Sequence, residues 1–133
     1  MGIRSNLNAN FDVDIASEFL DHYSMMVESM EVMIIDLSKQ YMRKRSIDKL
    51  FRVFHNIKSA SSFLAIQPMS RLATLVKDEL GELRSNTKPV NEETIDWLLA
   101  IRDMFTVWEQ NFVHDEALAK IHFSLLKLPD LEK

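Results

Sequence analysis

His55, near the middle of the chain, is the residue whose type and neighbours could best support chemistry. A free imidazole is mostly neutral near pH 7, and the neutral form is nucleophilic. Lys58 follows three residues later, about one helical turn away, so its ammonium could offset negative charge on a group bound to the imidazole. Ser59 and Ser62 place small hydroxyl residues around the imidazole. Group transfer at His55 is therefore the first chemical hypothesis.

The residues around His55 predict a helix that holds the imidazole away from the core. Positions spaced by three and four form one face, which we expect to be buried: Ile47, Leu50, Phe51, Phe54, Ile57, Ser61 and Leu64. His55 lies on the opposite side with Arg52, Ser59 and Ser62, and Lys58 lies at the edge of that exposed side. A lone exposed histidine on a helix is usually an ordinary solvated residue, so this position alone does not establish a function.

The same stretch resembles the histidine-containing phosphotransfer (HPt) domain. The similarity is carried by His55-x-x-Lys58-Ser59, by Phe63-Leu64-Ala65 after it and by Leu50-Phe51-Arg52 before it. The segment Phe51-Arg52-x-Phe54-His55-x-Ile57-Lys58 is most similar to the phosphorylatable first domain of chemotaxis-type histidine kinases. Because the helical spacing on both sides also fits, the resemblance covers about residues 15–112.

This resemblance implies a function and a set of site residues. His55 would carry the phosphoryl group and Lys58 would stabilise it, while Arg52, Ser59 and Ser62 would contact the partner. The protein would be a histidine phosphocarrier in a two-component phosphorelay. It would accept the group from a receiver-domain aspartate or a kinase and pass it to a response-regulator receiver. The expected partners are a receiver domain, a sensor histidine kinase, or both.

Four positions depart from the family pattern. The family usually has glycine where this chain has Ser59 and Ala65, although both substitutes are still small. The chemotaxis kinases usually carry a histidine and a glutamate where this chain has Thr74 and Lys77, and the glutamate helps to orient the phosphorylated imidazole. The loss of that glutamate favours a relay-type phosphocarrier.

The chain carries no sequence signal for making phosphohistidine from ATP. It has only two glycines, no glycine-rich loop, no Walker lysine and no carboxylate cluster for magnesium. We therefore expect a phosphotransfer protein with a phosphohistidine intermediate, rather than an ATP-binding enzyme. No cofactor is expected in the chain, and magnesium only in the active site of the partner.

Composition restricts the remaining classes. At 133 residues the chain fits one domain, and its scarcity of glycine and proline favours helices. The net charge of −4, with acids and bases interspersed, gives no sign of nucleic-acid binding. The absence of cysteine excludes disulfides and thiolate sites, and no apolar run reaches the roughly 18 residues of a membrane span. We expect a cytoplasmic protein without a membrane partner, and the length favours a monomer.

The pattern of apolar residues predicts an antiparallel up-down-up-down four-helix bundle with an additional short C-terminal helix. Residues 1–11 are expected to be a flexible N-terminal arm, and residues 12–133 an HPt-like bundle domain. The first long helix is predicted to run from Asp14 to about Tyr41 and to end on the cations 43–45. Ser46 is expected to cap the second helix and Asn91 the fourth, while Gln67-Pro68 separates the second from the third. The final short helix is predicted from Asp115 to about Leu126.

Two other functional classes stay open. The departures at Ser59, Ala65, Thr74 and Lys77 motivate a degenerate HPt-like module that docks a receiver or kinase without phosphotransfer. A structural helical bundle whose partner covers an exposed apolar stripe is the other class. Glu18 and His22 share a helix face, but no second carboxylate–histidine pair exists to complete a metal site, which favours an ordinary surface pair.

Overall fold

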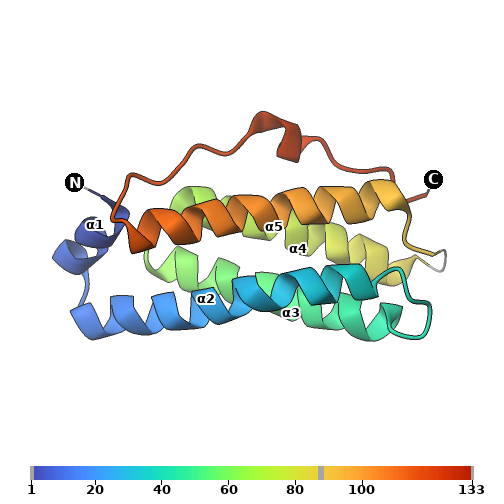
Figure 1. Ribbon diagram of the computed structural model, residues 1–133, viewed down its shortest axis with the longest axis horizontal. Coiled ribbons are helices and arrows are strands. Elements are labelled where there is room, and N and C mark those ends of the chain that lie inside the picture. The colour runs from blue at the N-terminus through green and yellow to red at the C-terminus, as the bar shows by residue number, and fades with distance from the viewer. Residues whose placement is uncertain (1, 87–88, 133) are drawn as a thin grey trace.

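Four long helices form the body of the protein. The computed structural model describes residues 2–86 and 89–132 and confirms the predicted all-α class. The helices are α2 (Val13–Asp36), α3 (Arg43–Phe63), α4 (Gln67–Ser85) and α5 (Glu92–Val113), and each runs antiparallel to the one before it (Figure 1). In the part of the chain that is described, no helix is long and apolar enough to cross a membrane.

Packed aromatic rings fill the centre of the bundle. Tyr23, Phe54, Phe105, Trp108 and Phe112 are buried, and neighbouring ring centroids lie 5.1–6.4 Å apart. Edge-to-face pairs of this kind contribute about 0.5–1.5 kcal/mol beyond the area that they bury. This core holds α3 rigidly, because Phe54 is the residue immediately before His55 and has no exposed surface.

The buried hydroxyl of Tyr23 leads to a prediction about alkaline stability. It donates a hydrogen bond of 2.5 Å to the carbonyl of Phe105, and burial, with a smaller contribution from Glu109, raises the pKa of Tyr23 well above its ordinary 10.0. In the unfolded chain the phenol ionises at its ordinary pKa, so this contribution to stability is complete below pH 10 and is lost as the pH rises above it. We expect wild type to lose more unfolding free energy than Tyr23→Phe between pH 9 and about pH 11, at up to ~1.4 kcal/mol per pH unit.

Chemical denaturation across that pH range measures this difference. Tyr23→Phe should also cost about 1 kcal/mol at neutral pH, because it removes a buried hydrogen bond. Tyr41→Phe is the matched control, since Tyr41 is 82% exposed. Equal alkaline slopes in wild type and Tyr23→Phe would contradict the prediction.

The turn between α2 and α3 lies earlier than predicted. Helix α2 ends at Asp36, and α3 begins at Arg43, so the cations 43–45 start a helix rather than end one. The predicted cap at Ser46 is wrong as well, because Ser46 lies within α3 and is buried. Cations are unfavourable at a helix N-terminus, but their unfavourable free energy is at most about 1 kcal/mol. The burial of Ile47 contributes more than this to stability.

The turn between α3 and α4 is tight and well capped. Ala65 has a φ of 59°, a left-handed conformation, while Ile66 N–H donates to Ser61 O at 2.8 Å and Ala65 N–H to Ser62 O at 3.1 Å. These two bonds form a Schellman motif, which satisfies the last carbonyls of α3. Pro68 then lies in the first turn of α4, as predicted.

Two other helix boundaries test the predicted caps and ends. Asn91 caps α5 as predicted, because its Oδ1 accepts a hydrogen bond of 2.8 Å from the N–H of Thr94. The additional short C-terminal helix is present only as a 3₁₀ turn, η1 (Phe123–Leu126). The rest of the predicted Asp115–Leu126 helix is not helical, and the segment runs along the outside of α5 (Figure 1).

Side chains of α5 hold this C-terminal segment in place. Trp97 Nε1 donates to the carbonyl of Leu125 at 2.9 Å, and Trp108 Nε1 donates to the carbonyl of Ala119 at 2.8 Å. A buried indole N–H needs an acceptor, and a nearby extended backbone offers free carbonyls that a helix would keep for itself. The two tryptophans therefore act as packing residues, and each gives one carbonyl of the C-terminal segment a hydrogen-bond donor.

The first eleven residues differ from the predicted flexible arm. They include a helix, α1 (Ile3–Asn10), with Leu7 buried against the bundle. Ile3 N–H donates to Glu116 O at 2.9 Å, and both the backbone N–H and the hydroxyl of Ser5 donate to the carboxylate of Asp115. These bonds hold the pKa of Asp115 below its ordinary 3.8. The segment was predicted to be flexible because most of its residues are polar, and the burial of Leu7 was not expected.

Candidate functional site

The structure places the five predicted site residues on the outer half of α3. His55, Arg52, Ser59 and Ser62 are exposed, and Lys58 is half-buried. The face predicted to be buried is buried except for Phe51, which is half-buried. An imidazole on the fourth turn of a 21-residue helix, directly after a core phenylalanine, is accessible to a partner but fixed in position.

The pairing of α3 with α4 fixes what lies beside His55. Arg84 Nε lies 3.0 Å from Asp48 Oδ1, and its guanidinium lies 4.2 Å from the centre of the Phe51 ring. A Cβ at Gly81 would also lie 3.8 Å from the Phe51 ring. Asp48 therefore lies opposite Arg84, and Phe51 opposite Gly81.

This register extends along both helices because they are antiparallel and rise equally per residue. Steps of three and four from Asp48 and Phe51, which contact α4, continue this side of α3 through positions 55, 58 and 62. The matching positions of α4 are 84, 81, 77, 74 and 70. The register thus places Lys77 opposite His55 and Thr74 opposite Lys58, and we call this strip of ten residues the α3–α4 flank.

Neither residue of α4 that faces His55 and Lys58 is a carboxylate. The hydroxyl of Thr74 donates to the carbonyl of Ser70 at 2.7 Å, so it is occupied within its own helix. Lys77 is half-buried, and no described residue forms an ion pair with it. The same holds for Lys58. Two ammonium groups near His55 thus lack a compensating acid among the described residues.

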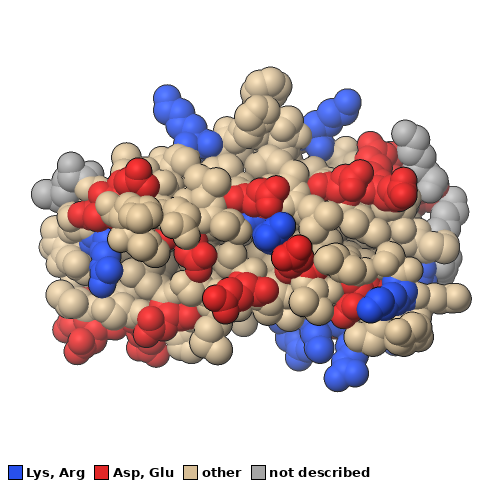
Figure 2. Space-filling view, viewed as in Figure 1, with Lys and Arg blue, Asp and Glu red and all other residues tan. Residues whose placement is uncertain are grey.

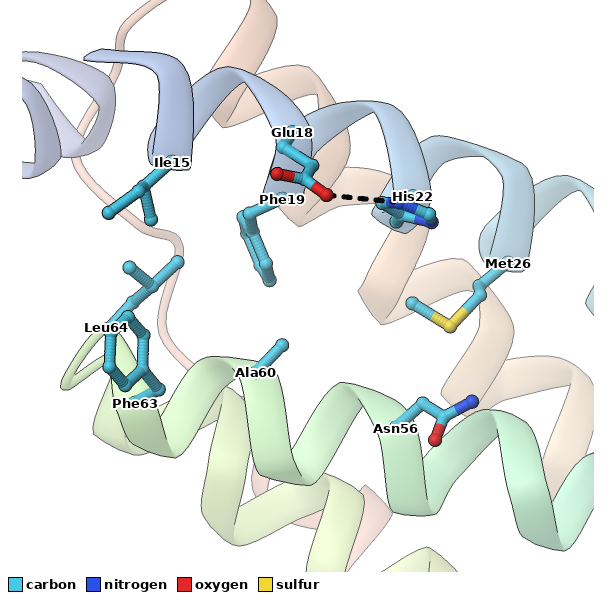
Figure 3. Close-up of a pocket in the computed structure, with 9 residues that line it drawn as sticks. All are labelled: Ile15, Glu18, Phe19, His22, Met26, Asn56, Ala60, Phe63 and Leu64. Atoms are coloured by element: carbon cyan, nitrogen blue, oxygen red, sulfur yellow. Dashed lines mark ion pairs between the residues drawn. The ribbon is translucent and has the colours of Figure 1, made fainter. Parts of the chain in front are cut away.

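An apolar groove lies on the other flank of α3, toward α2. It has a volume of about 350 Å³, and Figure 3 shows the side chains of α2 and α3 converging on it. Its apolar walls are formed by Ile15, Phe19, Met26, Ala60, Phe63 and Leu64. Asn56, the residue after His55, also lines the groove, so His55 lies on α3 next to the edge of the groove.

The apolar pattern of the sequence did not predict this groove. The available signal was a pair of apolar residues, Ile15 and Phe63, that lie outside the buried stripes of their helices and are 41% and 66% exposed. Isolated exposed apolar residues are common on protein surfaces, so neither residue pointed to a site by itself. Only the crossing of α2 over α3 brings them together.

Charge is distributed unevenly over the helices that form this region. Six cations and a single acid occur between residues 39 and 52, in a chain whose net charge is −4. Figure 2 shows basic side chains gathered over the first half of α3 and acidic ones along the first half of α2. Arg52 is the last of these cations and lies one turn before His55. The imidazole therefore stands at the end of a positively charged stretch.

The other histidines lack such surroundings. His22 lies at the rim of the groove, with its Nε2 3.9 Å from Glu18 Oε1, as expected for a surface pair (Figure 3). His122 accepts a hydrogen bond from Ser124 N–H and caps η1, and His114 ends α5. No group of three potential metal ligands occurs among the residues that the structure describes.

Comparison with known proteins identifies relatives of this chain. The family model described as the Hpt domain matches residues 14–111. The chain is similar to the chemotaxis protein CheA of Borreliella burgdorferi, with 24% identity over 91 residues, and to that of Treponema pallidum, with 23% over 91 residues. Each alignment covers 68% of this chain, but only 10% and 11% of the relatives, so the chain spans a small part of their length. No solved structure matches the chain.

Proposed function

Because the chain belongs to the Hpt domain family, a histidine phosphotransfer module of two-component signalling, we propose that His55 is the residue that carries the phosphoryl group. The observation that carries this proposal is an exposed imidazole, fixed on α3 directly after the buried Phe54, with the half-buried Lys58 one turn away. Lys58 would offset the charge of the bound group. Members of this family carry phosphoryl groups rather than bind ATP, in keeping with the absence of a nucleotide-binding loop from the sequence.

We propose a receiver-domain aspartyl phosphate as the donor. A neutral imidazole nitrogen of His55 attacks phosphorus, an N–P bond forms, and the P–O bond to the aspartate carboxylate breaks. The carboxylate leaves with the bonding electrons, and the imidazole N–H proton is lost to solvent. The reverse sequence on a second receiver discharges the carrier. The partner would supply magnesium, and docking would supply the alignment of the reacting atoms.

The groove between α2 and α3 is our proposed docking surface for the receiver domain. A receiver that presents its aspartate to His55 must cover the exposed side of α3. A typical protein–protein interface buries about 800 Å² on each partner. An area of that size centred on Arg52 and Ser59 would extend into the groove. Phe63 and Ile15 would then supply its apolar anchor.

Phe63→Glu tests this docking surface. Because Phe63 is 66% exposed, we expect the fold to survive, whereas a charge in the apolar anchor should weaken receiver binding by about tenfold or more. The matched control is Phe123→Glu, the same change at a phenylalanine that is 80% exposed on the segment outside α5. Titration calorimetry measures the affinity of both variants for the receiver. Equal affinities for the two variants would exclude the groove as the docking surface.

Transfer itself is tested by mixing the purified protein with a phosphorylated receiver domain. We expect acid-labile label on His55, detected by mass spectrometry at neutral pH, that can be discharged to a second receiver. Binding without any label would contradict the carrier proposal and indicate a docking module instead. Absence of both binding and label would contradict both functions.

A further inference from the structure

We propose that Lys77 is a second phosphoryl-binding cation, so that the phosphoryl group on His55 is held between lysines of two helices. This inference rests on the proposed function and adds a residue to its site. The register places Lys77 directly opposite His55, on the strip of α4 whose next members, Gly81 and Arg84, contact α3. Neighbouring helix axes lie about 8–10 Å apart, a gap that a lysine side chain can bridge.

The charge of the α3–α4 flank fits a phosphoryl group. With His55 neutral, the flank holds one acid, Asp48, and three cations, Lys58, Lys77 and Arg84. Asp48 is paired with Arg84 at 3.0 Å, so the charge left within the flank is that of two lysines, and Arg52 adds a cation one turn before His55 on the exposed side of α3. A phosphoryl group brings a charge of about −1.5 to −2 at pH 7. The two lysines of the flank can therefore offset it, whereas either lysine alone would leave about 0.5–1 negative charge uncompensated within the flank.

The half-burial of both lysines strengthens the argument. A half-buried lysine packs part of its aliphatic stem against the protein, so its ammonium group loses less freedom on binding an anion than that of a fully exposed lysine. Neither lysine has an acid three or four residues away on its own helix. Neither ammonium group therefore has an acid at the spacing that forms ion pairs along a helix.

The test uses phosphohistidine made without any partner. Phosphoramidate transfers its phosphoryl group to imidazole: its own P–N bond breaks, a new N–P bond forms, and ammonia leaves with the imidazole proton. A background in which the other three histidines are replaced by glutamine gives a single ³¹P signal, that of His55. The pH dependence of this signal reports the pKa of the phosphoryl group. The half-life of the signal reports the stability of phosphohistidine.

Lys77→Met should raise the pKa of the phosphoryl group by about 0.5–1 unit, because a nearby cation favours its dianion. Lys77→Arg should restore the wild-type value, which a purely structural role for Lys77 would not predict. The matched control is Lys49→Met on α3, six residues before His55 and outside the flank, which should change the pKa by less than about 0.2 unit.

The outcomes separate the inference from the function on which it rests. A titration of Lys77→Met that overlays that of Lys49→Met, with His55 fully labelled, would overturn the role of Lys77 and leave the carrier function intact. Failure of phosphoramidate and of a phosphorylated receiver to label His55 would overturn the proposed function, and the role of Lys77 with it.

Discussion

His55→Gln is expected to abolish phosphoryl transfer completely. Glutamine keeps a polar side chain of similar length but has no nucleophilic nitrogen, so no N–P bond can form. Because His55 is exposed, the substitution should change the free energy of unfolding by no more than about 0.5 kcal/mol. A total loss of label with unchanged stability would then reflect chemistry and not folding.

The measurement is transfer from a phosphorylated receiver, followed by mass spectrometry at neutral pH. His114→Gln is the matched control, because His114 is also exposed, ends a long helix and does not line the proposed docking groove. We expect His114→Gln to accept label at the wild-type level and His55→Gln to bind the receiver without accepting any. Acid-labile label that persists in His55→Gln would assign the chemistry to another residue.

Trp108→Ala is expected to have the largest effect on stability, a loss of about 3–5 kcal/mol in the free energy of unfolding. Trp108 has no exposed surface, and its ring packs edge-on against Phe105 with centroids 5.1 Å apart. Its Nε1 also donates to the carbonyl of Ala119, so the truncation removes an anchor of the C-terminal segment as well as core volume. Domains of this size are usually stable by only about 5–15 kcal/mol, so the variant should be close to unfolding.

Trp108→Phe divides this loss into its two parts. Phenylalanine keeps much of the apolar volume but removes the N–H, and it should cost less than the alanine variant while still releasing the segment near Ala119. Denaturant unfolding measures the stability, and amide hydrogen exchange at residues 117–121 measures the release. Val107→Ala, at an exposed neighbouring position, should cost less than about 1 kcal/mol. A cost for Trp108→Ala no greater than this control would show that the segment and the ring contribute little.

The helical class, the buried faces and the exposure of His55 could all be predicted from the amino-acid sequence. These properties depend on local spacing: a helix with 3.6 residues per turn puts Leu50, Phe54 and Ile57 on one face and His55 away from it. The cap at Asn91 and the helix start at Pro68 were equally predictable, because capping depends on a few consecutive residues. The resemblance to the HPt domain also followed from this short stretch.

How the helices meet could not be predicted in this way, because it depends on contacts between residues far apart in the sequence. The Asp48–Arg84 pair and the tight turn at Ala65 set the register that brings Lys77 opposite His55, and no periodicity within one helix contains that information. The same holds for the groove, which needs Ile15 and Phe63 from different helices. Residues 116–122 lie in a segment predicted to be helical but are not helical, and the indole N–H groups of α5 bond to carbonyls of that segment that a helix would use itself.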